Sequence, residues 1–325
     1  MSASSFVARE VKMRGLELSE RYFLECGLPM LRAEFPSLLP HLSAGLLGSG
    51  SECFGYDDEI SRDHDFEPGF CLLLPEEDVI DRRTAFRLER AYAALPREFL
   101  GYRRAPLSPV GGNRHGVLRL ADLLLEKTGT PDGRLSPREW LSLPEQSLAE
   151  VTNGRVFHDG SGALTEVRRR LSYLPEDVRL KRLAGYLLLS GQAGQYNYGR
   201  SLLRGDLGAA QLAASEFVRC VMHVIFLLNF TYIPYYKWRF RALSALPILG
   251  DLADPLYELI ASGNGEAEAA RKTATTEEVV RRVTAALAEG GLSDRGDEPL
   301  EAHAHAVNAL VRDAELRNLH ILYGV

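Results

Sequence analysis

Residues 48–70 read GSGSECFGYDDEISRDHDFEPGF, and this stretch decides the fold of the first half of the chain. Glycine and serine alternate over residues 48–51, and five acidic residues and one histidine follow between Asp57 and Asp65. The apolar runs 42–47 and 70–74 flank the stretch. Short apolar runs that stop at glycine predict buried strands entering tight turns. The sequence therefore predicts two strands joined by a glycine-serine turn and an acidic segment.

The surrounding segments extend this pattern into a small domain. Residues 8–26 and 81–95 carry apolar side chains at helical spacing. Residues 116–120 read as a strand that runs into a helix closed at Gly129, and GRVFHDGSGAL reads as a strand, a turn and a short element. We expect His158 and Asp159 to close that turn rather than to bind metal. Strands and helices in this order predict a small mixed sheet covered by helices.

From residue 175 onward the pattern becomes helical throughout. Asp206 is a predicted helix N-cap, and Thr275 with Glu278 has the spacing of a capping box. The segment ASGNGEAEAARKTA, residues 261–274, is predicted to be a polar loop. The sequence thus predicts the α+β class, with a mixed-sheet domain over residues 1–172 and an all-helical domain over residues 173–325.

Composition limits the classes of function. The chain has 325 residues and a formal net charge of -6, which argues against broad nucleic-acid binding by a basic surface. Its four cysteines form no CxxC pair, so a zinc site or a disulfide framework is not expected. The longest apolar run, residues 217–230, contains Arg219 and His223 and is predicted to be a buried helix, too short for a membrane span. We therefore expect a cytoplasmic protein.

The acidic segment has the chemistry of a metal site. On a strand, Asp63 and Asp65 would project on one face, while His64 would point to the other. Two carboxylates side by side suit a divalent cation such as Mg²⁺. Upstream, the backbone amides and hydroxyls of Gly48, Ser49, Gly50 and Ser51 suit phosphate oxygens, because glycine lets a ligand approach the backbone. The alternative is an acidic loop in which the glycines serve only as turns.

The stretch LLGSGSECFGYDDEISRDHDF resembles the glycine-serine turn and Asp-x-Asp strand of the polymerase-beta-like nucleotidyltransferase superfamily. With GQYNYGRSLLRGD and NFTYIPYYKWRFRAL, the chain is similar to a bacterial family with a domain of unknown function assigned to that superfamily. The resemblance implies that Gly48 and Ser49 bind phosphate. It also implies that Asp63 and Asp65 are the catalytic pair that binds Mg²⁺ or Mn²⁺.

Members of this superfamily usually carry a third carboxylate on a later strand. Here that strand is residues 116–120, and it has no acid at its centre. Asp122 lies just beyond the strand and Glu126 lies on the following helix, while Asp57, Asp58 and Glu59 are further candidates in the acidic segment. The sequence leaves the third carboxylate unassigned.

The helical half contains residues that are candidates to contact a nucleotide. Asn197, Arg200 and Arg204 share a face at helical spacing, which suits either triphosphate contacts or an interdomain salt-bridge surface. Lys237 lies among aromatic residues beside Pro234, where it is a candidate phosphate contact. The aromatic residues suit base stacking or helix packing equally.

Two functions are consistent with these residues. The first is a Mg²⁺-dependent nucleotidyltransferase that moves a nucleoside monophosphate from a nucleoside triphosphate, expected to be ATP, to an acceptor hydroxyl. The acceptor is a small molecule or a macromolecule. The second is a non-catalytic nucleotide-binding sensor or interaction protein with the same fold.

Overall fold

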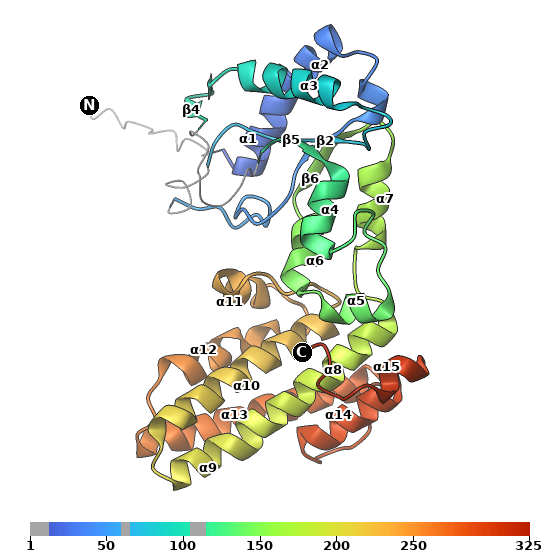
Figure 1. The fold of residues 1–325 in the computed structure, drawn as a ribbon. Coiled ribbons are helices and arrows are strands. Elements are labelled where there is room, and N and C mark those ends of the chain that lie inside the picture. The colour runs from blue at the N-terminus through green and yellow to red at the C-terminus, as the bar shows by residue number, and fades with distance from the viewer. Residues whose placement is uncertain (1–12, 60–65, 105–114) are drawn as a thin grey trace, which may run out of the picture. The chain divides into compact units, whose positions relative to one another are not determined.

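The computed structural model describes residues 13–59, 66–104 and 115–325. Its packing separates two compact units, Met1–Gly133 with Glu150–Leu171 and Arg134–Ala149 with Ser172–Val325 (Figure 1). The fold class is α+β, as the sequence predicts, with a mixed sheet in the first unit and a helical C-terminal region. Residues 134–149 precede the predicted boundary at 172 yet pack with the second unit. The assignment of residues 1–172 and 173–325 to two domains stays a prediction.

The first unit contains a four-stranded sheet among its described residues, in the order β5–β2–β1–β6. Its strands are β1 (Ser43–Leu46), β2 (Cys71–Leu74), β5 (Gly116–Arg119) and β6 (Arg155–Asp159). β1 pairs antiparallel with β2 and β6, and β2 pairs parallel with β5. Both central strands are buried at every position. Strands covered on both faces read as continuous apolar runs, which is why residues 42–47 and 70–74 identified them.

Helices and one small hairpin complete the first unit, with bounds α1 (Gly15–Tyr22), a π-helical turn (Phe23–Gly27), α2 (Leu28–Glu34), α3 (Arg82–Ala94), β3 (Glu98–Phe99), β4 (Tyr102–Arg103), α4 (Leu120–Thr128), α6 (Glu145–Thr152) and α7 (Ala163–Arg170). The division between the units falls within α6. The core includes an aromatic cluster in which Phe70 contacts Tyr22, Phe23 and Tyr92.

Two predicted chain reversals are confirmed in the first unit. Gly129 ends α4 with φ +75°, a conformation that glycine adopts without strain. Asp159 ends β6 and accepts hydrogen bonds from the Ser43 hydroxyl at 2.7 Å and the Thr165 amide at 2.8 Å. His158 contacts the Leu39 carbonyl oxygen through Nε2 at 2.9 Å. Asp159 thus leads into the turn, as the sequence predicts, whereas His158 lies within β6 and pairs with Ala44 of β1.

The second unit is helical, with bounds α5 (Pro137–Ser142), the start of α6, α8 (Glu176–Ser190), a π-helical stretch (Gly191–Asn197), α9 (Tyr198–Leu203), α10 (Leu207–Leu228), α11 (Arg239–Leu243), α12 (Ala253–Ala261), α13 (Glu266–Glu289), α14 (Leu300–Ala309) and α15 (Ala314–Asn318). Short 3₁₀ turns cover Leu39–His41 in the first unit and Tyr236–Trp238 and Gly250–Leu252 in the second. α8 packs against α10 and α14. Twelve of its 15 residues are buried, so α8 forms the centre of this unit.

Helix signals in the second half gave one correct boundary and one wrong one. Asp206 caps α10 by accepting a hydrogen bond from the Ala209 amide at 2.9 Å. The capping box at Thr275 is wrong, and the predicted polar loop over residues 261–274 is right only for residues 262–265, because α13 already begins at Glu266. Alanine, glutamate, lysine and arginine dominate residues 266–272, and these are strong helix formers. Because these residues are polar, the sequence predicts a loop here, although they belong to a helix that continues through Thr275.

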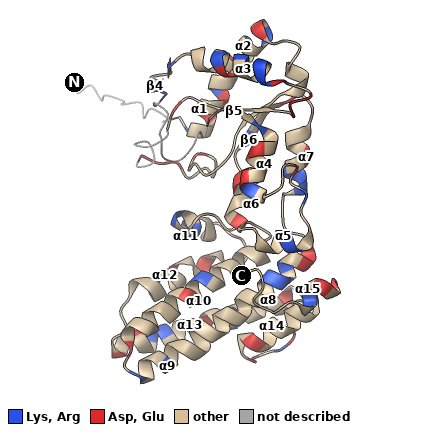
Figure 2. Cartoon of the chain, in the orientation of Figure 1, with Lys and Arg blue, Asp and Glu red and all other residues tan. Residues whose placement is uncertain are grey.

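Residues 217–228 of the apolar run lie in a largely buried helix as predicted, whereas Phe230 lies beyond its end and is exposed, and α10 already begins at Leu207. Among the described residues, α10 is the one helix long and apolar enough to cross a membrane, and 67% of its most apolar window is buried within the structure. Such burial is typical of a core helix in a soluble protein. Figure 2 shows both charge signs interspersed along the helices, in agreement with the modest net charge.

Candidate functional site

The glycine-serine turn leaves β1 through a conformation that requires glycine. Gly48 has φ +125°, which L side chains rarely adopt. The Asn153 side chain fixes this residue from both sides, accepting from the Gly48 amide at 3.0 Å and donating to its carbonyl oxygen at 2.7 Å. Consecutive turns then carry the chain from Gly50 to Tyr56. The turn is therefore held in place by β6 and the residues before it.

Several amides of the turn lack a hydrogen-bond acceptor among the described residues. Within residues 13–59, 66–104 and 115–325, the amides of Ser49, Gly50, Ser51 and Glu52 have no hydrogen-bond acceptor. Ser49 is exposed. Successive backbone amides that lack partners form a concavity suited to anions. The predicted phosphate-binding residues Gly48, Ser49, Gly50 and Ser51 thus lie together in one turn, and Ser49 is its exposed member.

Glu52 is a carboxylate beside this turn that the sequence did not single out. Its side chain folds over Gly50, whose missing Cβ would lie 2.0 Å from Glu52 Oε1. Glu52 is only 8% exposed, and in the described part of the chain its one polar contact is the Ser51 hydroxyl at 3.5 Å. A buried carboxylate without a positive partner costs free energy unless it takes a proton or a cation. Glu52 is therefore a candidate ligand of a cation.

The other predicted acids fall into separate places. Asp63 and Asp65 lie outside the described residues, as does His64. Asp57 accepts a hydrogen bond from the Gly15 amide at 2.9 Å, which holds the start of α1. Asp122 is exposed on α4. The described residues contain no group of three histidines, cysteines or acids placed to hold a metal ion.

Arg200 and Lys237 lie on different parts of the second unit. Arg200 is exposed on α9, where its guanidinium lies 4.7 Å from the centre of the Tyr196 ring. Lys237 is exposed just before α11, with its ammonium 5.0 Å from the Trp238 ring. Figure 1 shows α9 and α11 at opposite ends of this unit. The structure therefore does not bring these two predicted nucleotide contacts together.

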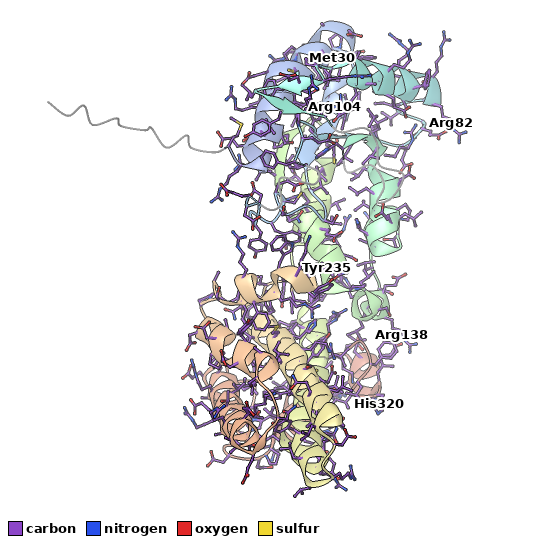
Figure 3. The ribbon with its side chains drawn as sticks, turned by 90° about the vertical axis from the view of Figure 1, so that its left-hand side faces the viewer. Met30, Arg82, Arg104, Arg138, Tyr235 and His320 are labelled. Carbon is purple, nitrogen blue, oxygen red and sulfur yellow. The ribbon has the colours of Figure 1, made fainter. Side chains whose placement is uncertain are left out.

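The aromatic segment before α11 is only partly buried. Tyr232 is buried, whereas Tyr235, labelled in Figure 3, is 41% exposed and packs against Tyr236 at 4.3 Å between ring centres. Core packing thus accounts for Tyr232, and Tyr235 and Tyr236 present aromatic surface to solvent.

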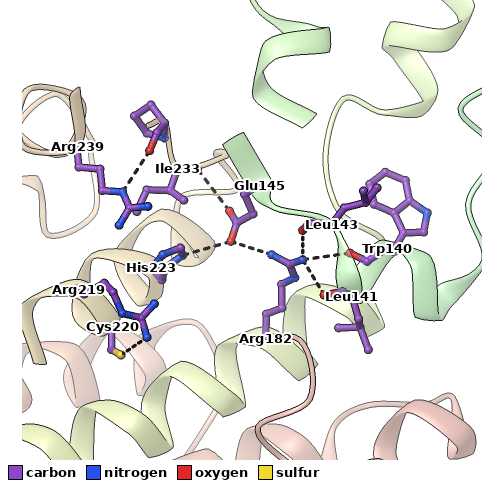
Figure 4. Close-up of polar contacts among 11 residues, drawn as sticks. Trp140, Leu141, Leu143, Glu145, Arg182, Arg219, Cys220, His223, Ile233 and Arg239 are labelled. Carbon is purple, nitrogen blue, oxygen red and sulfur yellow. Dashed lines mark hydrogen bonds and ion pairs between the residues drawn. The ribbon is translucent and has the colours of Figure 1, made fainter. Parts of the chain in front are cut away.

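A buried polar network lies in the second unit (Figure 4). Glu145 begins α6, and its side chain is 1% exposed. One of its oxygens lies 3.4 Å from Arg182 Nη1 and 3.5 Å from His223 Nδ1, and the other accepts from the Ile233 amide at 3.4 Å. The second Arg182 terminal nitrogen donates to the carbonyl oxygens of residues 140, 141 and 143.

Burial and charge set the protonation of this network. Burial opposes the ionisation of Glu145, but His223, Arg182 and the Ile233 amide outweigh it and lower the pKa of this carboxyl. Burial lowers the pKa of His223, and the Glu145 carboxylate offsets this only in part. The imidazole stacks on the Tyr186 ring, with 4.1 Å between ring centres. At neutral pH the network therefore holds a carboxylate, a guanidinium and a neutral imidazole.

This arrangement predicts that acid destabilises the second unit. Below pH 6.5 the unfolded chain protonates His223, whereas the folded chain resists, so stability falls as pH drops through that value. The slope is up to about 1.4 kcal/mol per pH unit for one proton. Urea unfolding between about pH 7.5 and 5.5 measures it. His223→Gln should flatten the slope, and the exposed control His305→Gln should keep it. Equal slopes in the wild type and His223→Gln would contradict the assignment.

Sequence reasoning missed Glu145, Arg182 and Arg239 and treated His223 only as evidence against a membrane span. One signal was present. α8 reads EDVRLKRLAGYLLLS, in which arginine and lysine interrupt a segment whose apolar residues lie on all faces. Charged residues on a helix without a polar face must be paired inside the protein.

The buried network lies in the part of the chain that matches a protein-family model. The searches of curated proteins and of solved structures found no match. Residues 140–239 match a family model described as a domain of unknown function (DUF4037). The match contains Glu145, Arg182, His223 and Arg239, and it begins well after the glycine-serine turn. The chain is therefore similar to this domain of unknown function over residues 140–239.

Proposed function

We propose that the protein is a Mg²⁺-dependent nucleotidyltransferase of the polymerase-beta-like type, acting in the cytoplasm on ATP and an acceptor hydroxyl. The observation that carries the proposal is the turn over Gly48–Ser51. It follows a buried strand, requires glycine at its first position and has successive amides without partners among the described residues. These are the features that a triphosphate-binding turn needs.

The donor set fits a hard divalent cation. Mg²⁺ takes oxygen ligands and is usually held by one or two carboxylates together with substrate phosphates. Asp63 and Asp65 would supply such carboxylates. We propose Glu52 as the third, because it is buried beside the turn without a positive partner in the described chain. When bound, the ion would neutralise the triphosphate and stabilise the charge that develops during transfer.

The chain's own residues would divide the remaining work. The amides of residues 49–52 would bind the β- and γ-phosphate oxygens and hold the nucleotide in line for attack. An acceptor oxygen would form a bond to the α-phosphorus as the bond to the bridging oxygen of the β-phosphate breaks and pyrophosphate leaves. The acceptor proton would pass to one of the carboxylates. Arg200 and Lys237 remain candidates for balancing charge.

A specific observation supports a second candidate, a nucleotide-binding sensor or interaction protein that does not catalyse transfer. β5 lies beside β2 and reads Gly-Val-Leu-Arg, so it offers no carboxylate. Arg119 at its end donates to the carbonyl oxygens of Pro75 and Ile80, at 2.5 and 3.0 Å. The usual strand of the third acid thus serves a structural role. If Glu52 does not replace that acid, the site binds without turnover.

Calorimetry with ATP and MgCl₂ tests the site. Replacing both Asp63 and Asp65 with alanine should weaken ATP binding at least about tenfold, because the metal that links carboxylate to phosphate is lost. Asp78→Ala, which removes an exposed acid in the turn after β2, is the matched control and should bind as the wild type does. Unchanged binding in the double variant would contradict the enzyme and the sensor alike.

Pyrophosphate release then separates the two candidates. An enzyme releases pyrophosphate from ATP when an acceptor is present, and a sensor does not. Glu52→Gln should suppress this release while ATP still binds. Release that continues undiminished in Glu52→Gln would remove Glu52 from the catalytic set.

A further inference from the structure

The second unit contains a cavity of 470 Å³ next to the buried network. Its lining includes Glu145, Arg182, Tyr186, His223 and Arg239, with apolar surface from Ile233. Small-molecule sites in proteins are typically about 300–1,000 Å³ and are mostly apolar with a few placed polar groups. The cavity therefore has the size of a ligand site, and its lining is richer in charged and polar groups than most.

The guanidinium group of Arg239 supplies a fork of hydrogen-bond donors to the lining of this cavity. Its Nε donates to the Pro234 carbonyl oxygen at 3.2 Å. Neither terminal nitrogen has a hydrogen-bond or ion-pair partner in the chain as far as the structure describes it. In contrast, Arg182 is committed to Glu145 and to carbonyl oxygens. The Glu145 carboxylate in the lining is thus paired with Arg182, and it acts on Arg239 only as a more distant charge.

The surroundings of Arg239 favour an anion at its fork. The guanidinium is half-buried, and burial lowers its pKa although Tyr186 and Glu145 act to raise it. Arg219 acts on it in the same direction as burial. Beside it lies His223, 7% exposed, whose ring stacks on Tyr186 and whose Nδ1 lies 3.5 Å from the Glu145 carboxylate. An oxyanion could accept from Arg239 in a bidentate manner while an aromatic or apolar body fills the cavity.

We propose that this cavity binds a small molecule that carries a carboxylate or phosphate group, with Arg239 as the residue that pairs with the anion and with Tyr186, His223 and Ile233 as the walls that hold its body. The proposal does not depend on the nucleotidyltransferase activity, because none of these residues belongs to the glycine-serine turn or the acidic segment.

Histidine-selective NMR tests the proposal on the full chain without nucleotide or metal. The His223 ring signal, assigned by its loss in His223→Gln, is followed during titration with benzoate, phenyl phosphate and neutral benzamide at constant ionic strength. We expect a saturable shift with benzoate or phenyl phosphate, and the better of the two identifies the anion. Benzamide should bind at least about tenfold more weakly, since it lacks the charge.

Variants assign the binding to Arg239. Arg239→Gln should raise the Kd of the preferred anion at least about tenfold. Arg241→Gln removes the same charge from an exposed position on the same helix and should leave the Kd within about twofold. Arg239→Lys keeps the charge without the fork and should give an intermediate Kd. The proposal is overturned if neither anion gives a saturable shift, if benzamide binds as well, or if Arg239→Gln and Arg241→Gln weaken binding equally.

Discussion

Replacing Glu145 with alanine is expected to destabilise the second unit by about 3–5 kcal/mol, the usual cost of removing one partner from a buried ion pair. Glu145 is 1% exposed, and Arg182, whose side chain is 4% exposed, depends on it for its counter-charge. The substitution would also leave the Ile233 amide and His223 without the carboxylate. Three groups from separate segments would lose one partner at once.

Tryptophan fluorescence in urea measures this effect selectively. The chain's two tryptophans, Trp140 and Trp238, both lie in the second unit, so the transition they report belongs to that unit. Glu278→Ala is the matched control, because Glu278 forms an exposed pair with Arg281 in α13 and such pairs contribute little. The assignment fails if Glu145→Ala and Glu278→Ala unfold at the same urea concentration.

Gly154→Ala is expected to destabilise the first unit by about 2–5 kcal/mol, from the strain of a left-handed residue and a direct clash. Gly154 has φ +62°, and a Cβ there would lie 1.9 Å from the Leu46 carbonyl oxygen. Its own amide donates to the Cys53 carbonyl oxygen at 2.9 Å. Since the neighbouring Asn153 holds Gly48, displacement of Gly154 would also disturb the glycine-serine turn.

Gly129→Ala is the control for Gly154→Ala, because it introduces the backbone strain without the steric clash. Gly129 has φ +75°, but a Cβ there would meet no atom within 4 Å, so only about 1–2 kcal/mol of strain is expected. Hydrogen exchange of the β1 amides measures both variants in the first unit. Similar protection in Gly154→Ala and Gly129→Ala would show that Gly154 does not pack against Leu46 as the structure indicates.

Elements with strong local signals could be predicted from the sequence. β5, α4 and Gly129 follow one another as expected, because an apolar run, a helical period and a left-handed glycine are each encoded within a few residues. The turn over Gly48–Ser51 was found for the same reason. Its phosphate-binding role and the pairing of Asp63 with Asp65 stay predictions.

Features that depend on distant residues could not be predicted. Glu145 meets Arg182 across 37 positions and Ile233 across 88, and no local pattern encodes such partners. Residues 134–149 join the second unit although they precede two elements of the first, which no composition change marks. The predicted start of α13 lies too late in the sequence because the first turns of this helix are polar. Polarity alone does not distinguish a loop from an exposed helix.

The π-helical stretch Gly191–Asn197 determines which side chains of α9 face the interior of the second unit. A π-helical stretch takes up one more residue than an α-helix would, and each α-helical residue turns the side chains by about 100°. Deleting one residue here would rotate Tyr198 away from Ala210 and Ala214, against which it packs. The residues of α9 therefore depend on the exact length of this stretch, and relatives that lack the extra residue would present a different face of α9 to solvent.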